Sequence, residues 1–102
     1  MIRKKFDGLV EAWLGHISST LVTKGDEYAY DEDRLINFKE AARMQGCTPE
    51  QALLGFVTKH LVSIYDSIKK ENYRDEHYWA EKIGDVICYF ILLDALLEER
   101  QT

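Results

Sequence analysis

The chain has 102 residues, 46% of them hydrophobic, and a formal net charge of −5. A chain of this size and composition can form one globular domain, residues 1–102, and its negative charge gives no general attraction to nucleic acid or to an anionic membrane. Because no apolar run reaches the ~20 residues that span a bilayer and two cysteines make no disulfide framework, we expect a cytoplasmic, reduced protein.

The first half of the chain predicts two helices separated by an irregular segment. Apolar residues recur at intervals of three and four over residues 2–22, which predicts an amphipathic helix. Residues 23–32 are acidic and have no steady period, so we expect a loop that ends in a helix N-cap at Asp31 or Asp33. A second helix then extends to about residue 45 and ends at Gly46.

The second half predicts two longer helices. Thr48 can cap the third helix, Pro49 suits its first position and Gln51 completes a reciprocal capping box. This helix should reach about residue 70, and a polar loop over residues 69–74 precedes a fourth helix that ends near residue 100. The core stripe predicted for the third helix comprises Leu53, Val57, Leu61, Ile64 and Ile68.

These elements predict an all-α domain of the four-helix bundle type. The fourth helix is apolar around most of its circumference, so we expect it to be enclosed on most sides. Trp13, Trp79 and Phe90 add more apolar surface than one small bundle readily encloses. We therefore expect a homodimer or higher oligomer formed through the first and fourth helices.

Two acids on the fourth helix are the first candidates for chemistry. Glu81 and Asp85 are one turn apart and could share Mg²⁺, which prefers oxygen ligands and usually keeps several waters. Asp85 is flanked by apolar residues, and a carboxylate in such a helix needs a hydrogen bond, an ion pair or a cation. The structural alternative is an acid satisfied by a donor from another helix.

His60 is the second candidate, because it lies beside the core stripe of the third helix. Contact with Asp85 or Glu81 is expected if the third and fourth helices pack together, and such a pair would fix the histidine tautomer. The alternative is a hydrogen-bonded core histidine without a chemical role.

The segment between the first two helices supplies the third candidate set. Its cations, amide and aromatic ring could hold the phosphate and base of a nucleotide, or could simply order an interhelical loop through an Arg34–Glu27 pair. The set comprises Lys24, Glu27, Tyr28, Arg34 and Asn37.

A resemblance to a known family rests on four segments, KGDEYAYDEDRLINFKEAA, CTPEQAL, KHLVSIYD and W-A-EKIGDVICYFILL. These residues resemble small proteins of phages and prophages of the nucleotide-modification-associated domain 1 type. That group is similar to a distant branch of the MazG-like all-α nucleoside-triphosphate pyrophosphatases. The resemblance covers roughly residues 24–97 and implies a MazG-like fold, helical oligomerisation and a nucleotide ligand.

The chain departs from this family at the acids that bind Mg²⁺, which follow an EExxE and an ExxD pattern. The first pattern falls on Lys59, His60 and Ser63, so its three acids are absent. Of the second, Asp85 is kept, with Glu81 close by. The resemblance therefore supports a MazG-like fold better than it supports hydrolysis of a nucleotide.

Two functions are expected. The first is binding of a nucleotide, with hydrolysis as its less favoured extension, in which Mg²⁺ lies on Glu81 and Asp85 and His60 orients a phosphate or water. The second is a non-catalytic phage accessory protein that binds a host or phage protein through the acidic, aromatic residues 26–33. The expected substrate contacts are Lys24, Glu27, Tyr28, Arg34, Asn37, Lys59 and Ser63.

Overall fold

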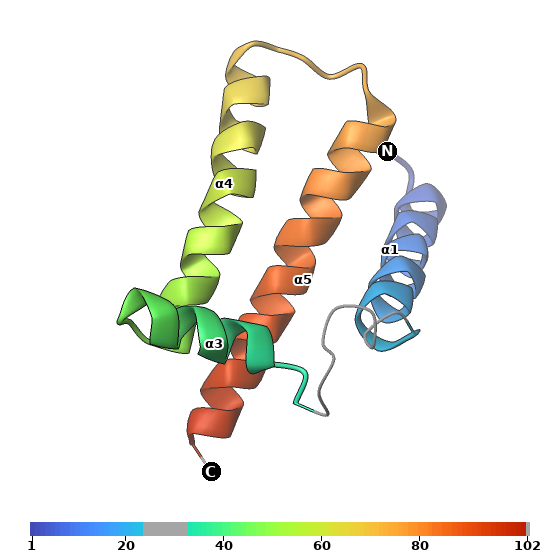
Figure 1. Ribbon diagram of the computed structural model, residues 1–102. Coiled ribbons are helices and arrows are strands. Elements are labelled where there is room, and N and C mark those ends of the chain that lie inside the picture. The colour runs from blue at the N-terminus through green and yellow to red at the C-terminus, as the bar shows by residue number, and fades with distance from the viewer. Residues whose placement is uncertain (24–32, 102) are drawn as a thin grey trace.

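The computed structural model describes residues 1–23 and 33–101. The elements in this part of the chain are α1 (Arg3–Ser18), the π-helical turn η1 (Ser19–Thr23), α3 (Ile36–Gln45), α4 (Pro49–Lys69) and α5 (Glu76–Arg100) (Figure 1). No strand occurs among these described residues, so the prediction of an all-α arrangement is confirmed. The described helices include none long and apolar enough to cross a membrane.

The predicted first helix differs from the observed one at its end, where the last turn is π-helical. The irregular segment predicted at residues 23–32 lies outside the described residues, apart from Thr23 in η1. Asp33 does not cap α3 directly, because α3 starts three residues later. Its Oδ1 atom instead accepts a hydrogen bond from Leu35 N at 2.9 Å and so stabilises the preceding turn.

α4 and α5 form an antiparallel pair along the length of the molecule (Figure 1). The predicted capping box starts α4, with Gln51 N donating to Thr48 Oγ1 at 3.1 Å and Thr48 N donating to Gln51 Oε1 at 2.9 Å. Asp75 caps α5 by accepting a hydrogen bond from Tyr78 N at 3.0 Å. The Tyr78 hydroxyl also donates to Ser63 O at 3.1 Å, which fastens α5 to α4.

α3 crosses the pair at the end where α4 begins and α5 finishes (Figure 1). α3 stops at Gly46, whose φ of 67° and ψ of 39° lie in the left-handed region that glycine adopts readily. The hydrophobic core sits under this crossing and is built around Leu35, Phe38, Leu53 and Leu96. The fold is therefore held most firmly at one end of the helix pair.

Ion pairs surround this buried end. Lys39 Nζ lies 2.5 Å from Asp33 Oδ2 and 2.6 Å from Glu99 Oε1, which joins α3 to the last turn of α5. Arg100 pairs with Glu50 and so joins the last turn of α5 to the first turn of α4 at this same end. The hydrogen bond from Lys39 is the main reason that the pKa of the Asp33 carboxyl is lowered.

Asp33→Asn should make the stability of the protein less sensitive to acid. Since the folded-state pKa of Asp33 is lowered, its carboxylate stabilises the fold above the unfolded-chain pKa of about 3.9, and this contribution is lost as the pH falls through the folded-state value. Melting temperatures from neutral pH down to about pH 2 test this. Asp7→Asn on exposed α1 is the control, and parallel curves for Asp33→Asn and the parent would contradict the prediction.

α1 packs mainly against α5, and none of its residues is buried. The contact depends on Gly84, where an added Cβ would lie 3.3 Å from both Trp13 Cζ3 and His16 Nε2. The missing side chain lets α1 approach α5 closely at this point. α1 is consequently held by a small contact on one face only.

The structure corrects two sequence expectations about burial. Leu61 is 43% and Ile68 50% exposed, so the predicted core stripe of α4 is covered only in its first half. α5 is not enclosed on most sides, because several of its large apolar side chains are also exposed. These are Ile83, Phe90, Ile91 and Leu97.

The total accessible surface is correspondingly large. The chain exposes 7866 Å², whereas a compact monomer of 11.9 kDa exposes about 6,000 Å². The difference of about 1,900 Å² is comparable with the area that one subunit buries in an obligate oligomer. Its radius of gyration of 15.6 Å also exceeds the roughly 13 Å of a compact domain of this length.

Candidate ligand-binding site

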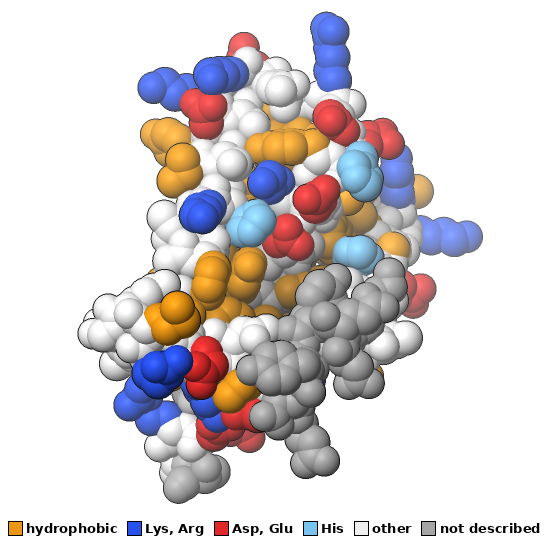
Figure 2. All heavy atoms as spheres, in the orientation of Figure 1, with side chains coloured by type: hydrophobic (Ala, Val, Ile, Leu, Met, Phe, Trp, Pro, Cys, Tyr) orange, Lys and Arg blue, Asp and Glu red, His pale blue; other side chains and the backbone are white. Residues whose placement is uncertain are grey.

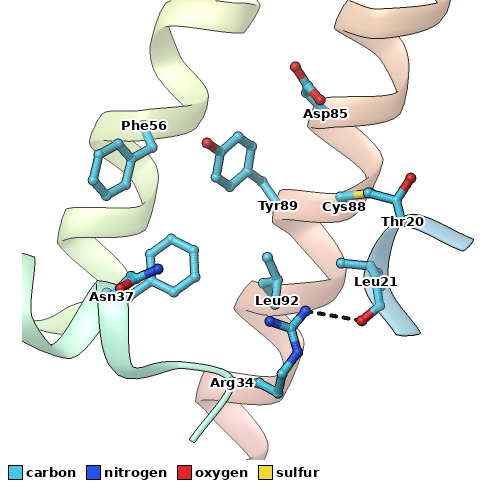
Figure 3. Close-up of a pocket in the computed structure, with 10 residues that line it drawn as sticks. Thr20, Leu21, Arg34, Asn37, Phe56, Asp85, Cys88, Tyr89 and Leu92 are labelled. Carbon is cyan, nitrogen blue, oxygen red and sulfur yellow. Dashed lines mark hydrogen bonds between the residues drawn. The ribbon is translucent and has the colours of Figure 1, made fainter. Parts of the chain in front are cut away.

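A cavity of about 350 Å³ lies where η1, α3, α4 and α5 meet (Figure 3). Its volume is near the lower end of the range for small-molecule sites, and its mostly apolar lining with a few polar groups is typical of them. The described lining residues are Thr20, Leu21, Arg34, Asn37, Phe38, Phe56, Asp85, Cys88, Tyr89 and Leu92.

The π-helical turn η1 supplies one wall of this cavity through Thr20 and Leu21. Arg34 Nη2 donates a hydrogen bond to Leu21 O at 3.0 Å, drawn as a dashed line in Figure 3. This bond joins η1 to the residues that lead into α3. It also fixes a guanidinium group at the lining of the cavity. π-helical turns are rare and occur frequently at functional sites.

Aromatic rings from three helices form the opposite wall. The Phe38 and Phe56 ring centroids are 5.9 Å apart with an interplanar angle of 65°, and those of Phe38 and Tyr89 are 6.4 Å apart at 72°. These are edge-to-face contacts, which are favourable for aromatic pairs. The wall offers apolar, planar surface to a flat ligand.

Asp85 lines the cavity from α5 and lies beside His60 of α4. The separation between Asp85 Oδ2 and His60 Nδ1 is 3.7 Å, so the predicted contact between these residues is confirmed. Figure 2 shows histidine and acidic side chains gathered over α4 and α5 on the face drawn. The Nδ1 atom is buried and has no hydrogen-bond partner among the described residues. At 3.7 Å the two groups are in contact without forming a hydrogen bond.

The surroundings of Asp85 differ from the sequence expectation. Its side chain is 41% exposed, so Asp85 is a half-exposed acid at a cavity rather than a charge enclosed in an apolar helix. Burial, together with the Asp85 charge, raises the pKa of the Tyr89 phenol and of the Cys88 thiol. Both groups therefore stay protonated at neutral pH, and the Tyr89 hydroxyl can donate a hydrogen bond to a ligand.

Glu81 does not join Asp85 in the structure. Its side chain is 60% exposed, and its Oε2 atom lies 3.7 Å from His77 Nε2 on the preceding turn of α5. Within residues 1–23 and 33–101 no group of three or more His, Cys, Asp or Glu residues is placed to hold a metal ion. Binding of Mg²⁺ by Glu81 and Asp85 stays a prediction from the sequence.

Comparison of the chain with protein-family models, curated proteins and solved structures finds no match. The geometry of the cavity and the chemistry of its residues are the basis for assigning a function.

The remaining predicted site residues fall into three groups. Arg34 and Asn37 line the cavity with Asp85, although they come from distant parts of the sequence. Lys59 is exposed on α4, and the Ser63 backbone carbonyl accepts the Tyr78 hydroxyl; neither is among the described lining residues. The predicted contacts at Lys24, Glu27 and Tyr28 lie outside the described residues.

Phe56 and Tyr89 are lining residues that the sequence reasoning missed. A signal for both was present, because each is four residues from a predicted site residue on its own helix. Phe56 precedes His60 by one turn, and Tyr89 follows Asp85 by one turn. The contribution of Thr20 and Leu21 had no such signal, since it depends on how η1 packs.

Proposed function

We propose that the cavity binds a nucleotide and that the chain is a MazG-like helical domain acting in a phage or prophage context. The observation that carries the proposal is that a guanidinium, a carboxylate and aromatic rings line one cavity. Arg34 suits phosphate oxygens, because its planar guanidinium presents several donors at fixed geometry. The rings of Phe38, Phe56 and Tyr89 suit a base, since stacking on aromatic side chains stabilises any nucleobase.

Binding is proposed ahead of hydrolysis. Hydrolysis would need the Mg²⁺ ion that the resemblance implies, and Glu81 and Asp85 are the two acids that would hold it. When bound, such an ion would polarise phosphate oxygens. His60 would then orient a phosphate or a water from its position beside Asp85. Product formation from nucleoside triphosphates, measured with and without Mg²⁺, tests this extension separately.

Arg34→Met should weaken nucleotide binding about tenfold or more, because a hydrogen bond to a charged group is lost. Arg43→Met is a matched control, since Arg43 lies on α3 away from the described lining residues, is exposed and pairs with Glu40 at 2.9 Å. Isothermal titration calorimetry of both variants and the parent measures the effect. An unchanged affinity in Arg34→Met, or no nucleotide binding by the parent, contradicts the proposal.

A protein-binding function is the alternative, and a separate observation favours it. Exposed apolar side chains follow α4 away from the core, with Val62 61% and Tyr65 73% exposed. Val62 and Tyr65 line a shallow hollow together with Asp66 and Lys69. The acidic surface expected at residues 26–33 lies outside the described residues apart from Asp33. A calorimetric screen that finds no nucleotide would favour this function instead.

A further inference from the structure

The charged groups of the cavity lie at its two ends. In Figure 3 Asp85 is drawn at one end of the cavity and Arg34 at the other, with Tyr89 and Leu92 at levels between them. Asp85 and Leu92 are separated by about two turns of α5, or roughly 10 Å along its axis. A base and a sugar together fill a span of this order. A nucleotide that places its phosphate at Arg34 therefore directs the far edge of its base towards Asp85.

We propose that Asp85 reads a guanine base, an inference that rests on the proposed nucleotide-binding function. A carboxylate only accepts hydrogen bonds, so it selects a base edge that carries donors. Guanine presents two adjacent donors on its pairing edge, N1–H and the N2 amino group, which match the two carboxylate oxygens. Adenine and cytosine present a donor beside an acceptor, and uracil presents one N–H between two carbonyl oxygens.

His60 acts in this assignment as a positioning residue. Its Nδ1 atom faces Asp85 Oδ2 at 3.7 Å and is the buried polar atom left without a partner in the described residues. When Nδ1 carries the proton, it is a donor aimed at a carboxylate oxygen 3.7 Å away, and a closer approach on ligand binding would let it hold the carboxylate plane in one orientation. The ring of His60 is itself held against Tyr89, with 5.6 Å between the centroids. α4 thus places a hydrogen-bond donor beside the carboxylate that would read the base.

The assignment gives Asp85 a different role from that of a metal ligand. A metal ligand acts on the phosphate end of any nucleotide and requires the cation. A base-reading carboxylate discriminates among bases and needs no cation. Glu81 separates the two roles further, because it would share a cation with Asp85 but contacts His77 instead and is not among the described residues that line the cavity.

Calorimetric titration of GMP, IMP and AMP, in chelator and then in Mg²⁺, tests the proposal on the intact protein. We expect GMP to bind about tenfold or more tightly than AMP, because a good bidentate base contact discriminates by this order. IMP lacks the amino group and should fall between them. The same ranking should hold in chelator.

Asp85→Asn should change the preference rather than abolish binding. The asparagine amide accepts from N1–H and donates to a carbonyl oxygen, so it matches xanthine, which has an oxygen in place of the guanine amino group. The affinity of the variant for GMP should fall about tenfold or more, and XMP should bind more tightly than GMP. Asp94→Asn, which changes an exposed acid on the same helix, should keep the parental order.

The outcomes separate this inference from the function on which it rests. Three outcomes would contradict recognition of guanine by Asp85 without contradicting nucleotide binding. They are equal affinity for the three nucleotides, a requirement for Mg²⁺, and an Asp85→Asn variant that still prefers GMP. Failure of every nucleotide to bind the parent overturns both. Circular dichroism melts of each variant establish that the folded protein is being compared.

Discussion

Leu53→Ala should lower the free energy of unfolding by about 2–5 kcal/mol. Leu53 is 0% exposed and belongs to the cluster beneath α3, so its removal leaves a cavity as well as losing apolar burial. The covered core is small, and the surrounding helices have few other buried residues to compensate. Urea unfolding followed by circular dichroism measures the change.

Leu54→Ala is the matched control for this experiment. Leu54 is the next residue on α4, has the same side chain and is 47% exposed. Its truncation should cost about 0.5 kcal/mol or less, as is usual for surface positions. If the two variants lost similar stability, the face of α4 turned towards α3 would not be the one described. If both were severely destabilised, the exposed face of α4 would have to be covered in solution.

The second large effect is expected in the mass of the protein in solution. We propose that the protein self-associates through α1 and α5, so light scattering should give at least twice the monomer mass of 11.9 kDa. α1 has no buried residue, and Phe90, one of the aromatic residues on which the sequence expectation was based, is 45% exposed. Trp13 and Trp79, the other two, are partly covered within the subunit. A monomer at micromolar concentration would contradict the proposal.

Leu14→Glu should shift this equilibrium towards monomer, because a carboxylate placed in an apolar interface is costly to desolvate. Leu14 lies on α1 and is 65% exposed, so the substitution disturbs little within one subunit. Val62→Glu on α4, at a site 61% exposed, introduces the same charge away from the proposed interface and should leave the mass unchanged. The reverse pattern would assign the interface to α4.

Local signals predicted most of the fold. The capping box at Thr48 and Gln51 and the glycine stop at Gly46 each determine a helix end through nearby residues alone. Helical periodicity found the apolar face of α4 but not how far it is covered. How much of the apolar face of α4 is buried depends on where α3 crosses it and on contacts with other molecules. The spacing of apolar residues specifies neither.

The sequence predicted only part of the candidate site, because residue spacing specifies which helix face a side chain lies on but not which other elements reach that face. His60 and Asp85 face each other because α4 and α5 pair along their length, which their apolar faces required. Glu81 was grouped with Asp85 on spacing, yet spacing equally allowed the contact with His77 that the structure contains. The wall made by η1 depends on a change of helix type, and apolar periodicity carries no information about it.

That change of helix type makes chain length, as well as composition, a determinant of the cavity. A π turn closes its hydrogen bond one residue later than an α turn does. Deleting one residue from Ser19–Thr23 would favour return to the α pattern and would rotate the residues of this turn that follow the deletion by about 100° relative to α1. Thr20 and Leu21 would then face a new direction with their chemistry unaltered. Related chains that differ by a single residue at this turn can therefore present different cavity walls on the same helical scaffold.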